Sequence, residues 1–169
     1  MPNSLPPRRT LWGARLPLRA QVITALLEHG ASINAVTTGV RFHQKATPLH
    51  LASYCGHADV TEFLVEKGAR IDALDESDKT PLMHAAAEGK KEAVERLIEL
   101  GASLTHADNE GKTALVLACE ESSHAPETIG TAYTLLRLGA CIEDNAVGDT
   151  AGEMLAAGKL ADHIKVCAS

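Results

Sequence analysis

The feature that most constrains this chain is an internal repeat, in which one short motif returns twice at a constant interval. The segment Thr-Pro-Leu-His-Leu-Ala at residues 47–52 recurs as Thr-Pro-Leu-Met-His-Ala at residues 80–85 and as Thr-Ala-Leu-Val-Leu-Ala at residues 113–118. A fixed period of about 33 residues predicts a row of similar units, each of which buries its apolar side against its neighbours. A Gly-Ala pair runs in phase with the motif, beginning at Gly30, Gly68, Gly101 and Gly139.

The first and third intervals between the Gly-Ala pairs are longer than the second, so two of the units carry five extra residues. One insertion falls within residues 36–46, where we expect an extended finger with an exposed Phe42. The other falls within residues 120–129, and we expect residues 121–129 to form a loop between two helices. Insertions in repeat proteins often lie on the binding face, which makes both segments secondary candidates for partner contact.

The sequence pattern of each unit predicts two helices with a short non-helical break between them. A threonine can cap the first helix by accepting a hydrogen bond from a backbone N–H, and the proline that follows it in two units suits the first helical position. A glycine then ends the first helix. The apolar residues that follow at helical spacing predict a second helix, which ends at the Gly-Ala pair. The capping threonines are Thr47, Thr80 and Thr113, and the breaks fall at Gly56 and Gly89.

These motifs resemble the ankyrin repeat family, which has the same period and a Thr-Pro-Leu-His-x-Ala signature. The resemblance covers roughly residues 9–160 and implies an all-α repeat solenoid, a helix-turn-helix stack with β-hairpin arms. It also implies that His50 is a structural residue that ties neighbouring repeats together, whereas Met83 stands at the matching position of the next repeat and His84 follows it.

The resemblance divides the chain into about four repeats and a cap. We expect residues 1–8 to be a disordered basic tail and residues 9–169 to form the repeat domain. The register of the cap is ambiguous by one residue around Thr150. The expected repeats are residues 9–46, 47–79, 80–112 and 113–149, followed by a C-terminal cap at residues 150–169.

Charge and hydropathy exclude several classes of function. The formal net charge is −6, and residues 1–19 hold four arginines and no acid, so the body of the chain is acidic and repels nucleic-acid phosphates. No stretch approaches the roughly 20 apolar residues of a membrane span, and prolines interrupt the N-terminus where a signal peptide would need an apolar run. We expect an intracellular monomer, cytoplasmic or nuclear.

The arginine-rich N-terminus has three interpretations. It is a truncated gene start or an expression remnant, a targeting signal, or a basic arm that lies against an acidic partner or against the chain's own acidic face. Four prolines within residues 1–19 make it a poor amphipathic transit helix, which favours the first interpretation.

The side chains that could carry chemistry do not form a catalytic or metal-binding pattern. His43, His50 and His57 recur every seven residues, but the repeat places them in a loop, a first helix and a helix break. The chain holds no phosphate-binding glycine loop and no zinc-protease motif. We therefore expect no metal, no cofactor and no enzymatic activity. The cysteines are widely spaced and form no CxxC pair: Cys55, Cys119, Cys141 and Cys167.

Stacked units of this kind leave one continuous concave face, made of hairpin tips and first-helix surfaces. Of the residues that the repeat places on it, five are acidic and two are basic, which favours a basic segment of another protein as the partner. Tyr54 is their only aromatic residue, and we expect it to be an apolar anchor. The alternative is a solubilising surface. The expected contact residues are His43, Gln44, Tyr54, Cys55, Glu76, Ser77, Lys79, Glu88, Asn109, Glu110, Lys112, Glu120 and Glu121.

The sequence thus predicts a non-catalytic protein interaction module: an adaptor, scaffold or inhibitor. The alternative is a regulatory subunit or modification substrate, and an enzyme ranks third. Asn34 matches the hairpin asparagine that is hydroxylated in some proteins of the similar family. The pattern is not sustained, because Asp72, Thr105 and Glu143 stand at the corresponding positions.

Overall fold

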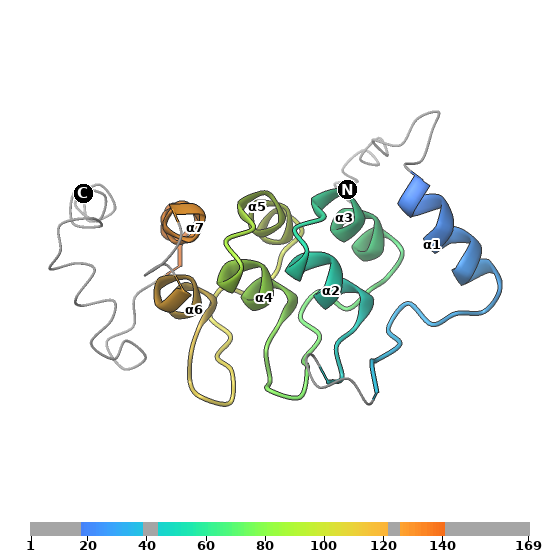
Figure 1. Cartoon of the computed structure of the whole chain (residues 1–169), viewed down its shortest axis with the longest axis horizontal. Helices are drawn as coiled ribbons and strands as arrows, with labels where there is room; N and C mark the ends of the chain where they lie inside the picture. The colour runs from blue at the N-terminus through green and yellow to red at the C-terminus, as the bar shows by residue number, and fades with distance from the viewer. Residues whose placement is uncertain (1–17, 39–43, 122–125, 141–169) are drawn as a thin grey trace, which may run out of the picture. The chain divides into compact units, whose positions relative to one another are not determined.

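The computed structural model of the chain describes residues 18–38, 44–121 and 126–140 (Figure 1). The chain divides into two compact units, Met1–Ala31 and Ser32–Ser169. The described part of the first unit is helix α1 (Leu18–Glu28), which ends at Gly30. Within α1, Ala20 is buried. The expected tail and the expected C-terminal cap lie outside the described residues.

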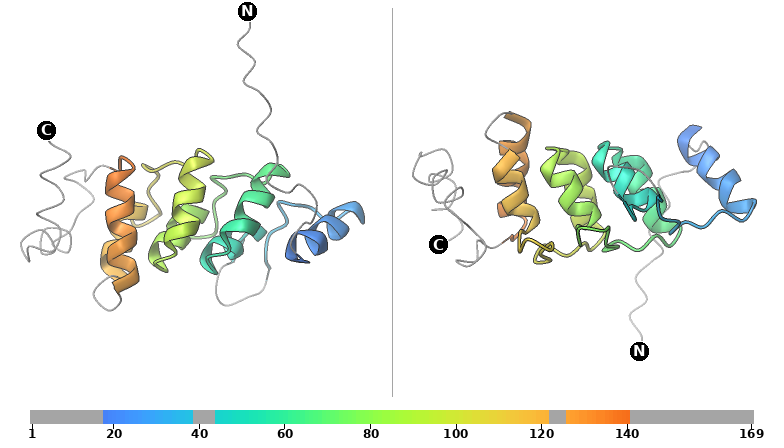
Figure 2. Two further views of the ribbon diagram at one scale, coloured as in Figure 1. Left: turned by 90° about the horizontal axis from the view of Figure 1, so that it is seen from above. Right: turned by 60° about the horizontal axis from the view of Figure 1, so that its bottom comes forward.

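Six helices of the second unit form three antiparallel pairs arranged in two layers (Figures 1 and 2). Helices α2, α4 and α6 pack side by side in an inner layer, and α3, α5 and α7 pack side by side in an outer layer. Each inner helix also packs against the outer helix that follows it in the chain, so the predicted helix-turn-helix stack is confirmed. The bounds are α2 Pro48–Tyr54, α3 Ala58–Glu66, α4 Pro81–Ala87, α5 Lys91–Glu99, α6 Ala114–Glu121 and α7 Pro126–Arg137.

The core lies between the two layers and repeats with the sequence. In the inner layer the leucine of the signature motif and the alanine three residues after it are buried in all three helices. In the outer layer a leucine near the end of each helix is buried to a similar degree. Small alanines let the helices approach closely, so the leucines interdigitate between neighbouring repeats. These positions are Leu49, Leu82 and Leu115, Ala52, Ala85 and Ala118, and Leu64, Leu97 and Leu135.

The predicted caps close the inner helices with local variations. The Thr80 hydroxyl accepts a hydrogen bond from the Met83 N–H at 3.3 Å, and the Thr113 hydroxyl accepts one from the Val116 N–H at 3.5 Å. At Thr47 the hydroxyl instead lies 2.9 Å from Nδ1 of His50, which also accepts the Thr47 backbone N–H at 3.1 Å. The imidazole therefore takes over part of the capping at α2.

The second helices end as the Gly-Ala pairs predict. Gly68 has φ +94°, and the N–H of Ala69 donates to the carbonyl of Leu64 at 2.9 Å. This is the left-handed helix end that glycine adopts without steric cost. The same geometry recurs after α5 and α7, so the pair marks the end of the outer helix in each repeat.

The arms between repeats are turns, and the prediction of β-hairpin arms is wrong for the residues that the structure describes. They contain no strand, and their one β-bridge joins Ala107 and Thr113. Backbone and side chain together close these turns. The N–H of Asp75 donates to the carbonyl of Lys79 at 3.1 Å, and Oδ1 of Asp75 accepts the N–H groups of Ser77 and Lys79 at 2.8 and 2.9 Å.

The second insertion is mostly helix, which corrects the prediction of a loop over residues 121–129. Helix α6 runs through Glu121 and α7 begins at Pro126, a residue suited to the first helical position. In the first insertion Thr37 and Ala46 pair at the base, where the Thr37 N–H donates to the Ala46 carbonyl at 2.9 Å. Phe42 lies outside the described residues, so the exposed finger stays a prediction. Within the described ranges no helix has the length and apolar character to cross a bilayer.

Candidate functional site

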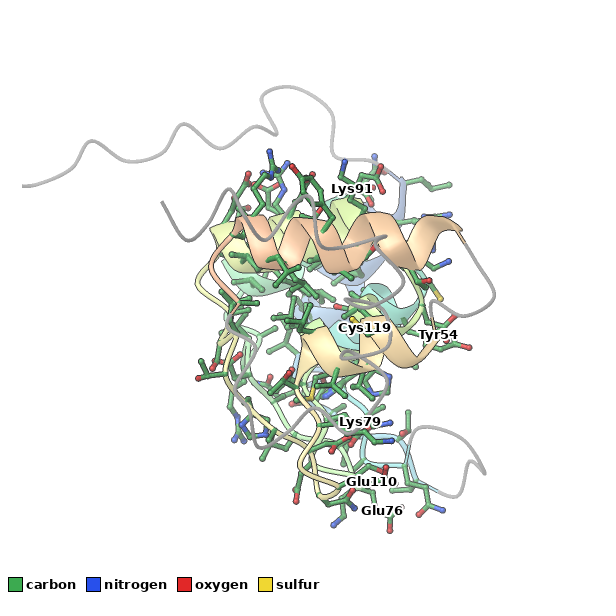
Figure 3. All side chains as sticks on the ribbon, turned by 90° about the vertical axis from the view of Figure 1, so that its left-hand side faces the viewer. Tyr54, Glu76, Lys79, Lys91, Glu110 and Cys119 are labelled. Carbon is green, nitrogen blue, oxygen red and sulfur yellow. The ribbon has the colours of Figure 1, made fainter. Side chains whose placement is uncertain are left out.

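Most of the predicted contact residues that the structure describes belong to what we call the inner face, formed by helices α2, α4 and α6 and by the turns at residues 75–79 and 108–112. Figure 3 shows the helices from the side: Tyr54 projects beside the inner helices, and Glu76 and Glu110 lie at the turns. Lys91 lies at the opposite end of the same view, on the outer helices. The repeat therefore brings residues from three successive units to one surface.

The turns are linked to one another through the backbone. The N–H of Glu76 donates to the carbonyl of Gln44 at 3.1 Å, and the N–H of Asn109 donates to the carbonyl of Ser77 at 3.1 Å. Each turn thereby holds the next at a fixed spacing. Gln44, Glu76, Asn109 and Glu110 are all exposed.

His50 ties helix α2 to the turn at residues 75–79, which precedes helix α4. Its Nε2–H donates to the carbonyl of Lys79 at 3.0 Å, while Nδ1 accepts the Thr47 N–H. Burial lowers the pKa of His50, so the ring stays neutral near pH 7 and can both donate and accept. The structural role that the family resemblance implied for His50 is thus confirmed.

In the next repeat, Met83 and His84 together take the place of His50: one contacts the capping threonine and the other bonds to a turn. The Met83 sulfur lies 3.4 Å from the Thr80 N–H, where the first repeat of the motif has an imidazole nitrogen. His84 bonds to the turn directly before its own helix, since its Nε2 lies 2.8 Å from Oδ2 of Asp75. Burial raises the pKa of Asp75, but the hydrogen bonds from His84, Lys79 and Ser77 outweigh it and lower the pKa to about 2.

A small cluster of rings forms the centre of the inner face. The rings of Tyr54 and His84 meet edge to face with centroids 6.4 Å apart, and those of His50 and His84 do so at 5.5 Å. Because His84 is fixed by Asp75, it holds the half-buried Tyr54 in one orientation. A pre-positioned tyrosine loses little conformational freedom when a partner covers it.

The structure places the other predicted residues as follows. Cys55 and Glu88 are the exposed residues that follow α2 and α4, and Lys79 and Ser77 are half-buried within the turn at 75–79. Lys112 pairs with Glu110 at 2.9 Å and lowers the pKa of that carboxyl. His43 lies outside the described residues, and Glu120 and Glu121 lie within α6 with side chains that the structure does not describe.

Sequence reasoning missed Leu51 and Ala87 on this face. Leu51 is 40 % exposed, one turn of helix before Tyr54, and Ala87 is half-buried. The repeat itself contained the signal that could have found Leu51. Leu51, His84 and Leu117 occupy the same position of successive motifs, and this position lies on the inner-face side of each first helix. Leu51 was treated only as part of the motif, so the apolar surface beside Tyr54 was underestimated.

The remaining candidate positions lie apart from this cluster. Oδ1 of Asn34 accepts the N–H of Arg70 at 3.0 Å, and Oδ1 of Asp72 accepts that of Ser103 at the same distance, so both side chains link successive repeats. Cys55 is exposed and Cys119 is buried in α6 (Figure 3). Among the residues that the structure describes, no group of three potential ligands could hold a metal ion.

Two family models match the chain. A model described as ankyrin repeats (3 copies) matches residues 71–146, and one described as ankyrin repeat matches residues 44–76. The matched region includes all six helices of the stack and almost none of the predicted repeat at residues 9–46. Ankyrin repeats are generally protein–protein interaction modules and are typically non-catalytic. The chain belongs to the ankyrin repeat family.

Proposed function

We propose that this protein binds a basic segment of another protein through its inner face and acts as an adaptor, scaffold or inhibitor. The observation that carries the proposal is the combination of exposed acidic residues with an oriented apolar patch on one surface. Glu76, Glu88 and Glu110 are exposed there, and Tyr54 lies beside the exposed Leu51.

The acidic residues and the apolar residues contribute to such a complex in different ways. Exposed carboxylates raise the rate at which a basic segment meets the face, and this contribution weakens at high salt. An apolar anchor slows dissociation because the partner must expose it to water again. Tyr54 and Leu51 together supply that anchor, and the His84–Asp75 pair holds Tyr54 in position.

Affinity capture with the full chain, followed by identification of the bound protein, tests the proposal. The Glu76→Lys and Glu110→Lys variants should bind the identified partner at least tenfold more weakly, because both reverse a charge on the inner face. Glu66→Lys is the matched control, since Glu66 is exposed at the end of the outer helix α3. Equal losses in all three variants would reduce the effect to net charge and reject the inner face as the site.

The anchor has its own test. Replacing Tyr54 with Ala should weaken binding by about 2 kcal/mol, a typical value for a buried tyrosine at an interface. Tyr133→Ala is the control, because Tyr133 is 41 % exposed on the outer helix α7. An unchanged dissociation constant for Tyr54→Ala, measured by calorimetry, would remove Tyr54 from the site.

The second candidate function is a modification substrate, with hydroxylation at Asn34. The Asn34 side chain is half-buried and its Oδ1 is held by the Arg70 N–H, so the modifying enzyme would have to release this link. Mass spectrometry after co-expression with an asparaginyl hydroxylase tests this candidate. Absence of an added oxygen on Asn34 would dismiss it.

A further inference from the structure

The turn carboxylates of two successive repeats differ in how they are paired. Asp75 and Asp108 occupy equivalent positions one period apart, are 7 % and 6 % exposed, and each accept two backbone N–H groups through Oδ1. Oδ2 of Asp75 is paired with His84 at 2.8 Å. Oδ2 of Asp108 is buried and has no hydrogen-bond partner within the described ranges.

The difference comes from one residue of the inner helix. His84 follows Asp75 by nine residues, and the residue that follows Asp108 by nine is Leu117, whose side chain has no hydrogen-bonding group. The turn at residues 108–112 therefore keeps the geometry that holds the carboxylate in place but lacks the histidine that pairs with Oδ2 in the turn at residues 75–79. A buried carboxylate oxygen without a donor is costly, and the cost is recovered when a charged donor arrives.

We propose that Oδ2 of Asp108 receives the ammonium or guanidinium group of a lysine or arginine from the basic partner segment, an inference that rests on the proposed function. Asp108 belongs to the inner face, and the exposed Asn109 and Glu110 follow it in the same turn. Glu110 and the nearby Glu76 attract a basic segment to this end of the surface (Figure 3). Because Asp108 is only 6 % exposed, a long and narrow cationic side chain suits the position best.

Oδ2 is the one unpaired oxygen of Asp108, because Oδ1 already accepts the N–H groups of Glu110 and Lys112. The incoming cation therefore makes a single charge-assisted hydrogen bond here, and not the paired contact of an arginine with a free carboxylate. Asp108 would select for positive charge, while Tyr54 and Leu51 would select for an apolar neighbour in the partner sequence.

The test uses the full chain and an acetylated nine-residue peptide in which arginine alternates with leucine. Asp108→Asn should weaken peptide binding at least tenfold in calorimetry, while the melting temperature of the free protein stays the same or rises because an unpaired buried charge is removed. Asp78→Asn, with the same charge change at an exposed position of the neighbouring turn, should weaken binding less than threefold. Leu117→His should also weaken binding, because an internal donor then competes for Oδ2.

Two further comparisons separate the possible outcomes. Asp75→Asn should lower the melting temperature because its partner His84 is lost, and a peptide with citrulline in place of arginine should bind at least tenfold more weakly. If Asp108→Asn lowers the melting temperature as Asp75→Asn does, or changes affinity no more than Asp78→Asn, the inference is wrong and the proposed function stands. If neither peptide binds the unaltered protein, both fail.

Discussion

At the scale of single residues, the turns contain one position that requires a left-handed backbone. Lys45 and Asp78 have φ +57° and +58°, and Gly111 occupies the third equivalent position with φ +79°. The sequence shows a glycine in only one of the three turns, so the requirement could not be deduced from the other two. The two turns without glycine tolerate the strain because hydrogen bonds hold their backbones in place. Lys45 bonds to Thr37, Asp78 bonds to Asp75, and each turn also bonds to the turn of the next repeat.

Replacing Lys45 with glycine should stabilise the protein by about 0.5 kcal/mol. The substitution relieves the left-handed strain of a long side chain, and the greater freedom of glycine in the unfolded chain offsets part of the gain. Urea unfolding followed by circular dichroism measures the difference. Lys91→Gly, inside helix α5, should lower stability. A loss of stability in the Lys45 variant would show that its side chain contributes contacts that outweigh the strain.

Because of Asp75, the free energy of unfolding should decrease at acidic pH. Its folded pKa is about 2 and its ordinary value is 3.8, so its contribution is complete above about pH 4 and is lost as the pH falls towards 2. The shift corresponds to about 2 kcal/mol. Urea unfolding between pH 2 and 5 should show a shallower fall for Asp75→Asn than for the unaltered protein. Asp59→Asn, at an exposed position in α3, should keep the steeper fall, and an equally steep curve for Asp75→Asn would contradict the pairing.

At the scale of helices and turns, the helices of the stack could be predicted because capping residues, apolar spacing and terminal glycines agree with one another. The structure of the arms could not be predicted. The side chains of Asp75 and Asp108 help to close the turns there, and strand propensity does not take such side-chain hydrogen bonds into account. The second insertion was predicted as a loop because insertions in repeat proteins map to loops, whereas Pro126 starts a helix of twelve residues. Local capping chemistry decided the outcome there.

The outer helices should contribute stability through their buried leucines. Leu97 of α5 is fully buried between neighbouring helices, so Leu97→Ala should destabilise the protein by about 3 kcal/mol. Leu74→Ala is the control, because Leu74 is 43 % exposed and its truncation should cost less than about 1 kcal/mol. Thermal and urea unfolding measure both values. Similar losses for the two variants would contradict the assignment of Leu97 to the shared core.

At the scale of the whole molecule, the unit Ser32–Ser169 is held together by contacts that recur from repeat to repeat. His50, Asn34 and Asp72 each reach the backbone of a following repeat. The period alone predicted this stack, because units of fixed length can bury their apolar sides only against one another. The inner face was predicted by position, but the exposure of Leu51, the pairing of Asp75 and the unpaired oxygen of Asp108 depend on three-dimensional packing that no spacing rule contains.

The most direct test of the central claim is amide chemical-shift mapping of the full chain as the captured partner is added. The proposed interaction predicts that the shifts concentrate at Tyr54, Glu76, Glu88 and Asn109, which come from the inner helices and turns of successive units. Shifts confined to the outer helices α3 and α5, with the inner face unchanged, would contradict it.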